Sequence, residues 1–294
     1  MTPAGLDGPA IGTFFAMGIR RVLLSVFVAV FAVAGLVTGP PAKAVPVWAP
    51  AATAPIHPGV QTITGGAGQC TANFVFHSGT EVYIGQAAHC AGTGAATETN
   101  GCDAASMPLN TRVDVDGATQ PGTMVYSSWL TMQQLGETDP DTCAYNDLAL
   151  VRLDPADHGR VNPSIPVWGG PVGVNTTGTA LGDDVYSYGN SSLRLGLTLL
   201  SPKRGISVLN DGGGWNHTVY TLTPGIPGDS GSAFLDPTGQ ALGVLSTVAV
   251  LPLPLSNGVG DVGRELAYAQ AKWNAGLQLA NGTEPFNPNA LPLG

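Results

Sequence analysis

The sequence predicts an all-β globular protein. Its 294 residues include 41 Gly and 24 Pro, whereas only 11% are charged. This composition favours many short strands joined by tight turns over long surface helices. A hydrophobic content of 44% is ample for a buried core in one large or two small domains. We find no repeat of fixed short period.

The first 44 residues differ in pattern from the rest of the chain. A basic pair at 20–21 precedes an apolar run at 22–37, and a small-residue site follows at 42–44. This order predicts a secretory signal peptide over 1–44, cleaved after the last alanine of that site. A membrane anchor is the alternative, but the apolar run is shorter than the ~20 residues that a bilayer requires. Residues 1–16 add length that a signal peptide does not need, which indicates an over-long start.

The net charge of the chain limits the kinds of molecule that it can bind. Removal of the signal peptide leaves 8 basic and 19 acidic residues, a net charge of −11. Nucleic acids and anionic membranes are therefore unsuitable partners. The sequence predicts a secreted, extracellular protein that is not bound to a membrane after signal removal, and we expect a monomer.

Four cysteines lie downstream of the predicted signal peptide, at positions 70, 90, 102 and 143. An even number in an exported protein predicts two disulfides, and the numbers alone leave three pairings open. A zinc site is the alternative, but the chain has no C-x-x-C pair and no closely spaced Cys/His set. No metal is expected.

Strand-like runs cover most of the chain after a Pro/Ala-rich segment at 45–59, which we interpret as an extended leader or short pro-segment that builds no core. The runs are 71–76, 81–85, 111–115, 122–132, 146–153, 184–189, 196–202, 217–223 and 240–251. Apolar residues then recur at helical spacing within 261–280, which predicts one amphipathic helix. The tail at 281–294 is expected to be disordered.

Ser230 stands in a stretch rich in Gly and Pro, "TPGIPGDSGSAF", and raises the question of nucleophilic chemistry. A serine hydroxyl is a weak nucleophile unless a histidine, oriented by a carboxylate, removes its proton. His89 is the best candidate because it follows a strand and small residues and precedes a cysteine. The other four histidines stand where surface or structural roles are the default: His57, His77, His158 and His217.

Three motifs, "AAHC", "NDLALVRL" and "PGDSGSA", occur in the order His, Asp, Ser. Together they resemble the trypsin-like (chymotrypsin-fold) serine proteases, and more particularly the secreted bacterial branch. The resemblance spans about 60–280. It implies two packed antiparallel six-stranded β-barrels, one over about 60–160 and one over about 174–260, with a C-terminal helix over about 261–280.

The resemblance also assigns roles. His89 would be the general base and acid, Asp147 would orient the imidazole, and Ser230 would attack the scissile carbonyl of a protein or peptide substrate. The backbone N–H groups of Gly228 and Ser230 would form the oxyanion hole. No metal or organic cofactor is implied. The disulfides of the family imply the pairings Cys70–Cys90 and Cys102–Cys143.

Other classes fit less well. The "GDSGS" sequence lacks the final glycine of the G-x-S-x-G elbow, and α/β-hydrolases carry their triad in the order Ser, Asp, His. A non-catalytic binding or adhesion protein on the same fold is the alternative from another class. Such proteins usually lose a member of the triad, and all three residues are present here.

Departures from the family pattern concern the specificity pocket and the partner of Asp229. Pro224 stands where trypsin carries its acidic residue, which disfavours a pocket for Lys or Arg. Leu245 replaces the histidine of glutamate-specific relatives, and Val248 replaces a pocket glycine, so we expect small or medium apolar side chains at the P1 position of the substrate. The residues expected to bind substrate are Pro224, Ser246, Thr247 and Val248. Asp229 has two candidate partners, Arg194 and Arg204, or it faces solvent in a turn.

Overall fold

The structure is a computed structural model that describes residues 45–95, 97–248 and 254–290. The predicted signal peptide lies outside these residues, as do positions 249–251 of the last strand-like run and the final four residues of the tail. No helix in the described part of the chain is long and apolar enough to cross a bilayer.

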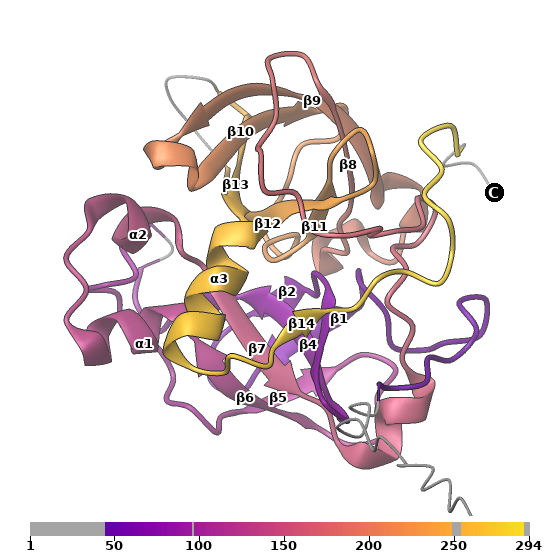
Figure 1. Cartoon of the computed structure of the whole chain (residues 1–294), viewed down its shortest axis with the longest axis horizontal. Coiled ribbons are helices and arrows are strands. Elements are labelled where there is room, and N and C mark those ends of the chain that lie inside the picture. The colour runs from indigo at the N-terminus through magenta and orange to yellow at the C-terminus, as the bar shows by residue number, and fades with distance from the viewer. Residues whose placement is uncertain (1–44, 96, 249–253, 291–294) are drawn as a thin grey trace, which may run out of the picture. The chain divides into compact units, whose positions relative to one another are not determined.

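The N-terminal half forms an antiparallel sheet of eight strands in the order β14-β3-β4-β7-β6-β5-β1-β2 (Figure 1). The strands are β1 (Gln61–Thr64), β2 (Gln69–Thr71), β3 (Val75–Ser78), β4 (Glu81–Ala87), β5 (Arg112–Val115), β6 (Gly122–Ser127), β7 (Leu148–Arg152) and β14 (Gln278–Leu279). Fully buried aliphatic side chains of β4, β6 and β7 fill its inner face, among them Ile84, Met124 and Val151.

The C-terminal half is a closed barrel of six antiparallel strands in the order β10-β13-β12-β11-β8-β9. Its strands are β8 (Asp184–Tyr188), β9 (Pro202–Asp211), β10 (Asn216–Thr221), β11 (Ala233–Leu235), β12 (Ala241–Val248) and β13 (Asn257–Asp261). The predicted two-barrel, all-β fold class is confirmed. The first half has eight strands instead of six because 61–71 forms two short strands and the chain end adds β14 to the edge of β3.

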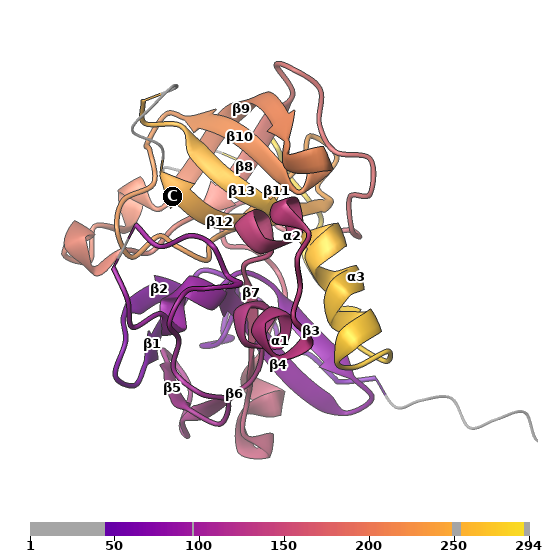
Figure 2. The ribbon, with the colours of Figure 1, turned by 90° about the vertical axis from the view of Figure 1, so that its left-hand side faces the viewer.

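Among the described residues three α-helices accompany the strands: α1 (Ser128–Leu135), α2 (Pro140–Tyr145) and α3 (Val262–Lys272). The Asp261 side chain caps α3 by accepting a hydrogen bond from the Arg264 N–H at 2.8 Å. Helix α3 contacts β12 and β13 of the barrel as well as β7 of the sheet, and Figure 2 shows it running beside both halves.

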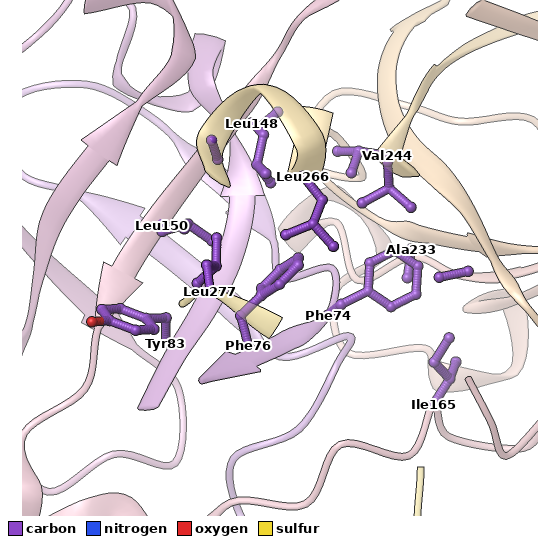
Figure 3. Close-up of a cluster of buried hydrophobic side chains, with 14 of the residues drawn as sticks. Phe74, Phe76, Tyr83, Leu148, Leu150, Ile165, Ala233, Val244, Leu266 and Leu277 are labelled. Carbon is purple, nitrogen blue, oxygen red and sulfur yellow. The ribbon is translucent and has the colours of Figure 1, made fainter. Parts of the chain in front are cut away.

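A shared apolar cluster joins the two halves (Figure 3). Phe74, Phe76 and Leu150 enter it from the sheet, and Ala233 and Val244 enter it from the barrel. The cluster also contains Leu266 of α3 and Leu277, both buried. Burial of this common core holds the sheet, the barrel and α3 together, since apolar area removed from water is the main favourable contribution to folding.

Three strand or helix predictions need correction. The run at 122–132 is a strand followed by a helix, because Ser127 ends β6 and its side chain caps α1. The run at 196–202 contains a short 3₁₀ turn, η4 (Thr198–Leu200), with exposed leucines. The predicted helix over 261–280 ends at Lys272, after which the chain turns and forms β14.

Strand β9 was not predicted. Six of its ten residues are Pro, Gly, Lys, Arg, Asn or Asp, so it shows no clear alternation of apolar and polar positions. Its hydrogen bonds to β8 and β10 complete the barrel, and that long-range pairing compensates for the weak local pattern.

The expectation that 45–59 builds no core is wrong. Ile56 is 0% exposed and forms a parallel bridge with Val161, whose carbonyl also accepts the Ala49 N–H at 2.8 Å. The described part of the tail, 281–290, is also packed against the fold: the Phe286 ring lies 5.2 Å from that of Tyr186 between centroids.

The packing of the N-terminal segment gives a direct test. We expect Ile56→Ala to lower the free energy of unfolding by about 2 to 5 kcal/mol, the range for truncating a fully buried Ile. Chemical denaturation measures the change. Val47→Ala is the matched control, because Val47 is 85% exposed and its truncation should leave stability nearly unchanged. Equal stabilities of the two variants would contradict the packing of this segment.

Candidate active site

The pairing of β4 with β7 brings His89 and Asp147 together. His89 lies in the 3₁₀ turn η1 (Ala88–Ala91) that directly follows β4, and Asp147 directly precedes β7. Ala87 and Leu148 are opposite each other in the antiparallel pair. Ala88, which follows Ala87, therefore lies beside Asp147, which precedes Leu148. The Ala88 N–H donates to the Asp147 carbonyl at 2.8 Å, which extends the ladder by one step.

The Asp147 carboxylate fixes the imidazole of His89. The Nδ1–H of His89 donates to Oδ2 at 2.6 Å, and the backbone N–H of His89 donates to Oδ1 at 2.8 Å. Ser246 of β12 donates its hydroxyl to Oδ2 at 2.6 Å. Because Nδ1 carries the proton in this arrangement, Nε2 has a free lone pair and can accept a proton. The pair therefore has the geometry of an oriented general base.

The electrostatics of the pair favour the protonated imidazole. Burial lowers the pKa of His89, but the charge of Asp147 and its hydrogen bond raise that pKa by more, so it lies above the ordinary value of 6.5. A raised pKa makes the ring a stronger base and stabilises the imidazolium that forms when a proton is taken up.

Ser230 lies in the loop between β10 and β11, close to the end of β4. The Thr71 N–H donates to the Ser230 carbonyl at 2.8 Å. Gly231 has φ +87°, and a Cβ there would lie 2.5 Å from the Thr71 carbonyl oxygen and 3.0 Å from the Ala87 nitrogen. Only glycine allows this approach, which brings the serine to the strand end that His89 follows.

Within the described residues the Ser230 hydroxyl makes no hydrogen bond, either to His89 or to another group. Catalytic hydrogen bonds are often loose without substrate and shorten in the complex. The structure therefore brings His89 and Asp147 into contact and places Ser230 on an adjacent loop.

The Gly228 peptide has the features of an oxyanion-binding loop. Gly228 has φ +95°, and a Cβ would lie 2.5 Å from Gln69 Oε1 and 2.9 Å from Ser191 Oγ. Its carbonyl accepts hydrogen bonds from Thr71 Oγ1 at 2.8 Å and from Gln69 Nε2 at 3.1 Å. In the part of the chain that the structure describes, the N–H groups of Gly228 and Ser230 donate to no acceptor. Both remain available for a developing negative charge.

Asp229 is fully buried and has two cationic partners. Arg194 Nη2 and Lys203 Nζ both contact its Oδ2, the lysine at 3.0 Å. Of the two arginines considered from the sequence, the structure selects Arg194. Arg204 instead pairs with Asp184 at the surface, at 3.0 Å.

Lys203 was missed by the sequence analysis, because it stands in the strand β9, which has no recognisable motif. It is 1% exposed, and its Nζ also donates to the carbonyl oxygens of Thr223 at 3.0 Å and Pro224 at 3.1 Å. Burial lowers the pKa of Lys203, the charge of Asp229 opposes that change, and nearby Arg194 lowers it further. Lys203 thus bonds both to Asp229 and to the backbone at 223–224, which precedes the loop that carries Ser230.

Two of the residues expected to bind substrate, Pro224 and Val248, lie next to Gly225. A Cβ on Gly225 would lie 3.4 Å from Val248 Cγ2 and 2.9 Å from Asn257 Oδ1. The Gly225 N–H donates to Asn257 Oδ1 at 3.0 Å. The Val248 side chain therefore lies close to Gly225, the residue that follows Pro224. Asn257, fully buried here, was not singled out from the sequence.

Ser246 and Thr247 precede Val248 on β12. The hydroxyl of Ser246 is bonded to Asp147, so its side chain serves the His89 pair. Thr247 is paired with Gly258 of β13, and a Cβ on that glycine would lie 2.3 Å from Thr247 Oγ1. The Thr247 side chain is thus packed against β13.

Two disulfides stabilise the surroundings of His89 and Asp147: Cys70–Cys90 and Cys102–Cys143. They close loops with sequence separations of 20 and 41 residues. Loop-closure entropy alone gives each a contribution of about 3 to 4 kcal/mol. Since the sulfurs beside His89 are bonded to each other, they offer no thiolate to a metal ion.

His217 has a structural environment, in agreement with the default role given to it. It is 1% exposed, with Nδ1 at 2.7 Å from Asn210 Oδ1 and Nε2 at 3.0 Å from Asp261 Oδ2. A separate cleft of about 310 Å³ lies beside it and Arg264. None of the three residues expected to be catalytic lines this cleft.

No protein-family model and no curated protein matches the chain. In structure it is similar to Thermobifida fusca protease A, at 19% identity and a TM-score of 0.46, with 77% of this chain and 99% of that chain covered. It is also similar to Cellulomonas bogoriensis chymotrypsin, at 18% identity and a TM-score of 0.45, with 76% and 98% covered. A glutamic acid-specific serine protease gives 16% identity and a TM-score of 0.48, with 76% and 100% covered.

The buried ion pair gives a test of the serine loop. Arg194→Met should lower the free energy of unfolding by about 3 kcal/mol, because Asp229 would keep its charge in a buried site with one cation fewer. Urea denaturation measures this change. Arg204→Met is the matched control, since its surface pair with Asp184 should contribute little. If Arg204→Met destabilised as much as Arg194→Met, the assignment of Arg194 to Asp229 would be wrong.

Proposed function

We propose that the chain is a secreted serine endopeptidase that hydrolyses peptide bonds through an acyl-enzyme. The observation that carries this proposal is the buried Asp147 carboxylate, which accepts the Nδ1–H of His89 at 2.6 Å and so leaves Nε2 free to take a proton. The loop that carries Ser230 lies next to this pair, and among the described residues the N–H groups of Gly228 and of Ser230 itself donate to no acceptor.

In the proposed mechanism, His89 Nε2 removes the proton of Ser230 while Oγ attacks the scissile carbonyl carbon. The N–H groups of Gly228 and Ser230 stabilise the oxyanion of the tetrahedral intermediate. Asp147 stabilises the imidazolium, which then protonates the leaving amine. Water attacks the acyl-enzyme in the second half of the reaction, again with His89 as the base, and Ser230 is regenerated.

The packing of Val248 supports a preference for small or medium apolar P1 side chains. Val248 Cγ2 lies 3.4 Å from the position that a Cβ on Gly225 would take, and Asn257 Oδ1 accepts a hydrogen bond from the Gly225 N–H at 3.0 Å. In the proposed pocket, a long aromatic or charged side chain would have to displace Val248. The buried Lys203 nearby is already bonded to Asp229 and to two carbonyl groups, so it leaves no free charge for an acidic P1 residue.

Secretion is part of the proposal. Both disulfides fit an oxidising compartment, and a signal peptide is predicted for residues 1–44. The proposed substrates are proteins or peptides, and the mechanism requires no metal or organic cofactor.

Covalent labelling distinguishes the proposed endopeptidase from the alternative, a non-catalytic binding protein on this fold. A fluorophosphonate probe should label the folded protein at Ser230 and abolish hydrolysis of a mixed peptide library, because only an activated serine reacts with such probes. Ser230→Ala should be unlabelled and should lose at least about 10³-fold in kcat. Ser232→Ala is the control and should be labelled normally. A folded Ser230→Ala protein with undiminished peptidase activity would exclude the proposal.

Pocket depth is tested separately. Val248→Gly should raise kcat/KM for substrates with Phe or Leu at P1 by about tenfold or more relative to Ala, because removal of the branched side chain lengthens the pocket. Cleavage of matched peptides that differ only at P1 measures the change. An unchanged P1 profile would show that Val248 does not limit the pocket.

A further inference from the structure

A second carboxyl group lies directly behind Asp147. Glu265, in the first turn of α3, is 0% exposed. Its Oε1 accepts a hydrogen bond from the backbone N–H of Asp147 at 2.9 Å. This is a contact between residues 118 positions apart, from a helix to the residue that orients His89. This hydrogen bond connects α3 to the backbone of Asp147 and involves no side chain that would meet substrate.

The surrounding backbone leaves room for this carboxyl group. A Cβ on Gly260 would lie 2.7 Å from Glu265 Oε1 and 3.0 Å from the Tyr145 carbonyl oxygen. Any residue larger than glycine at this position of β13 would therefore push Glu265 away from the Asp147 N–H. The absence of a side chain at Gly260 thus leaves space for the Oε1 atom of Glu265.

The environment of Glu265 disfavours a negative charge. Among the described residues no Lys, Arg or His forms an ion pair with it, and its Oε2 has no hydrogen-bond partner. The ionisable groups that face it are Asp147, Asp261 and the buried hydroxyl of Tyr126. Burial raises the pKa of Glu265 well above its ordinary value of 4.5; the Asp147 N–H opposes this rise, and the charges of Asp147 and Asp261 add to it.

We propose that Glu265 is a positioning residue, whose neutral carboxyl group holds the backbone of Asp147 in the orientation that presents its carboxylate to His89. The inference rests on the proposed function, since it concerns the geometry of the same His89–Asp147 pair. A carboxylic acid can accept a hydrogen bond through its carbonyl oxygen without adding a charge beside Asp147. An ionised Glu265 would instead repel Asp147 and make the His89 imidazolium too stable to give up its proton readily.

Kinetics of two variants test the contact. Glu265→Gln keeps a neutral carbonyl acceptor, so kcat should stay within about twofold of the wild-type value. Glu265→Met has a similar volume but leaves the buried Asp147 N–H without an acceptor, and kcat should fall on the order of tenfold with little change in KM. A kcat for Glu265→Met equal to that of the wild type would overturn the positioning role.

The pH profile tests the charge state. The acid limb of kcat/KM reports the protonation of His89, whose raised pKa places this limb above pH 6.5. If Glu265 is neutral, Glu265→Gln removes no charge and the limb stays in place. A shift of the limb to lower pH in Glu265→Gln would show that a negative charge had been removed, and would overturn the proposal.

A measurement without catalysis keeps the inference separate from the proposed function. In a Ser230→Ala background, the Tm of Glu265→Gln is compared with that of the Glu265 protein from pH 4 to pH 8. A carboxyl group whose folded pKa is raised holds its proton in the native state and loses it on unfolding, so stability falls as pH rises above about 4.5. Glu265→Gln has no ionisable group at this position, so its Tm minus the Tm of the Glu265 protein should increase with pH.

The matched control for this measurement is Glu81→Gln, because Glu81 is exposed and its replacement should give no such trend. A Tm difference for Glu265→Gln that does not vary with pH would overturn the neutral state. If the trend is present but the wild-type protein hydrolyses no peptide, the proposed function fails while the buried neutral Glu265 stands.

Discussion

The site depends on the buried carboxylate of Asp147. It precedes β7 of the N-terminal sheet, accepts two hydrogen bonds from His89 and one from Ser246 of the C-terminal barrel, and is 3% exposed. Its backbone N–H reaches Glu265 of α3. One residue therefore bonds to the sheet, the barrel and the helix that runs beside both. A carboxylate removed from water requires such a set of donors, and these donors fix the position of the imidazole.

Two fully buried carboxyl groups next to the site, those of Asp229 and Glu265, are stabilised in opposite ways. Asp229 has Arg194 and Lys203 against it, so its negative charge is balanced within the serine loop. Glu265 has no such cation among the described residues and lies near two other acidic residues, so the neutral form is favoured. Both groups hold a residue of the proposed active site in place. Asp229 directly precedes Ser230, and Glu265 accepts a hydrogen bond from the backbone N–H of Asp147. A charged pair gives the loop a rigid anchor, whereas a neutral acceptor supports Asp147 without disturbing the charge of the His89 pair.

Close backbone approach is the second requirement of the site. Gly228 and Gly231 flank the segment that carries Ser230, and both have positive φ values. At Gly228 a Cβ would collide with β2 and with the loop at Ser191, and at Gly231 it would collide with β2 and β4. These close approaches hold the serine beside the end of β4, which leads into His89. In the described part of the chain, the N–H groups of Gly228 and Ser230 have no acceptor. Val248 lies close to Gly225 in the same way, because this glycine has no side chain.

The amino-acid sequence by itself determined the all-β class, the motifs around His89, Asp147 and Ser230, and the glycines of the serine loop, because these depend on local composition and short spacings. It did not determine that 45–59 packs into the core, that β9 closes the barrel, or that Arg194 and not Arg204 meets Asp229. Lys203 and Glu265 carry no local signal at all, since each lies in an ordinary strand or helix. Their roles arise only when β9 and α3 are packed against loops that are distant in the sequence. Tertiary structure decided these roles because burial, which changes the charge preference of an ionisable group and fixes its partners, is a property of the folded chain and not of the neighbouring residues.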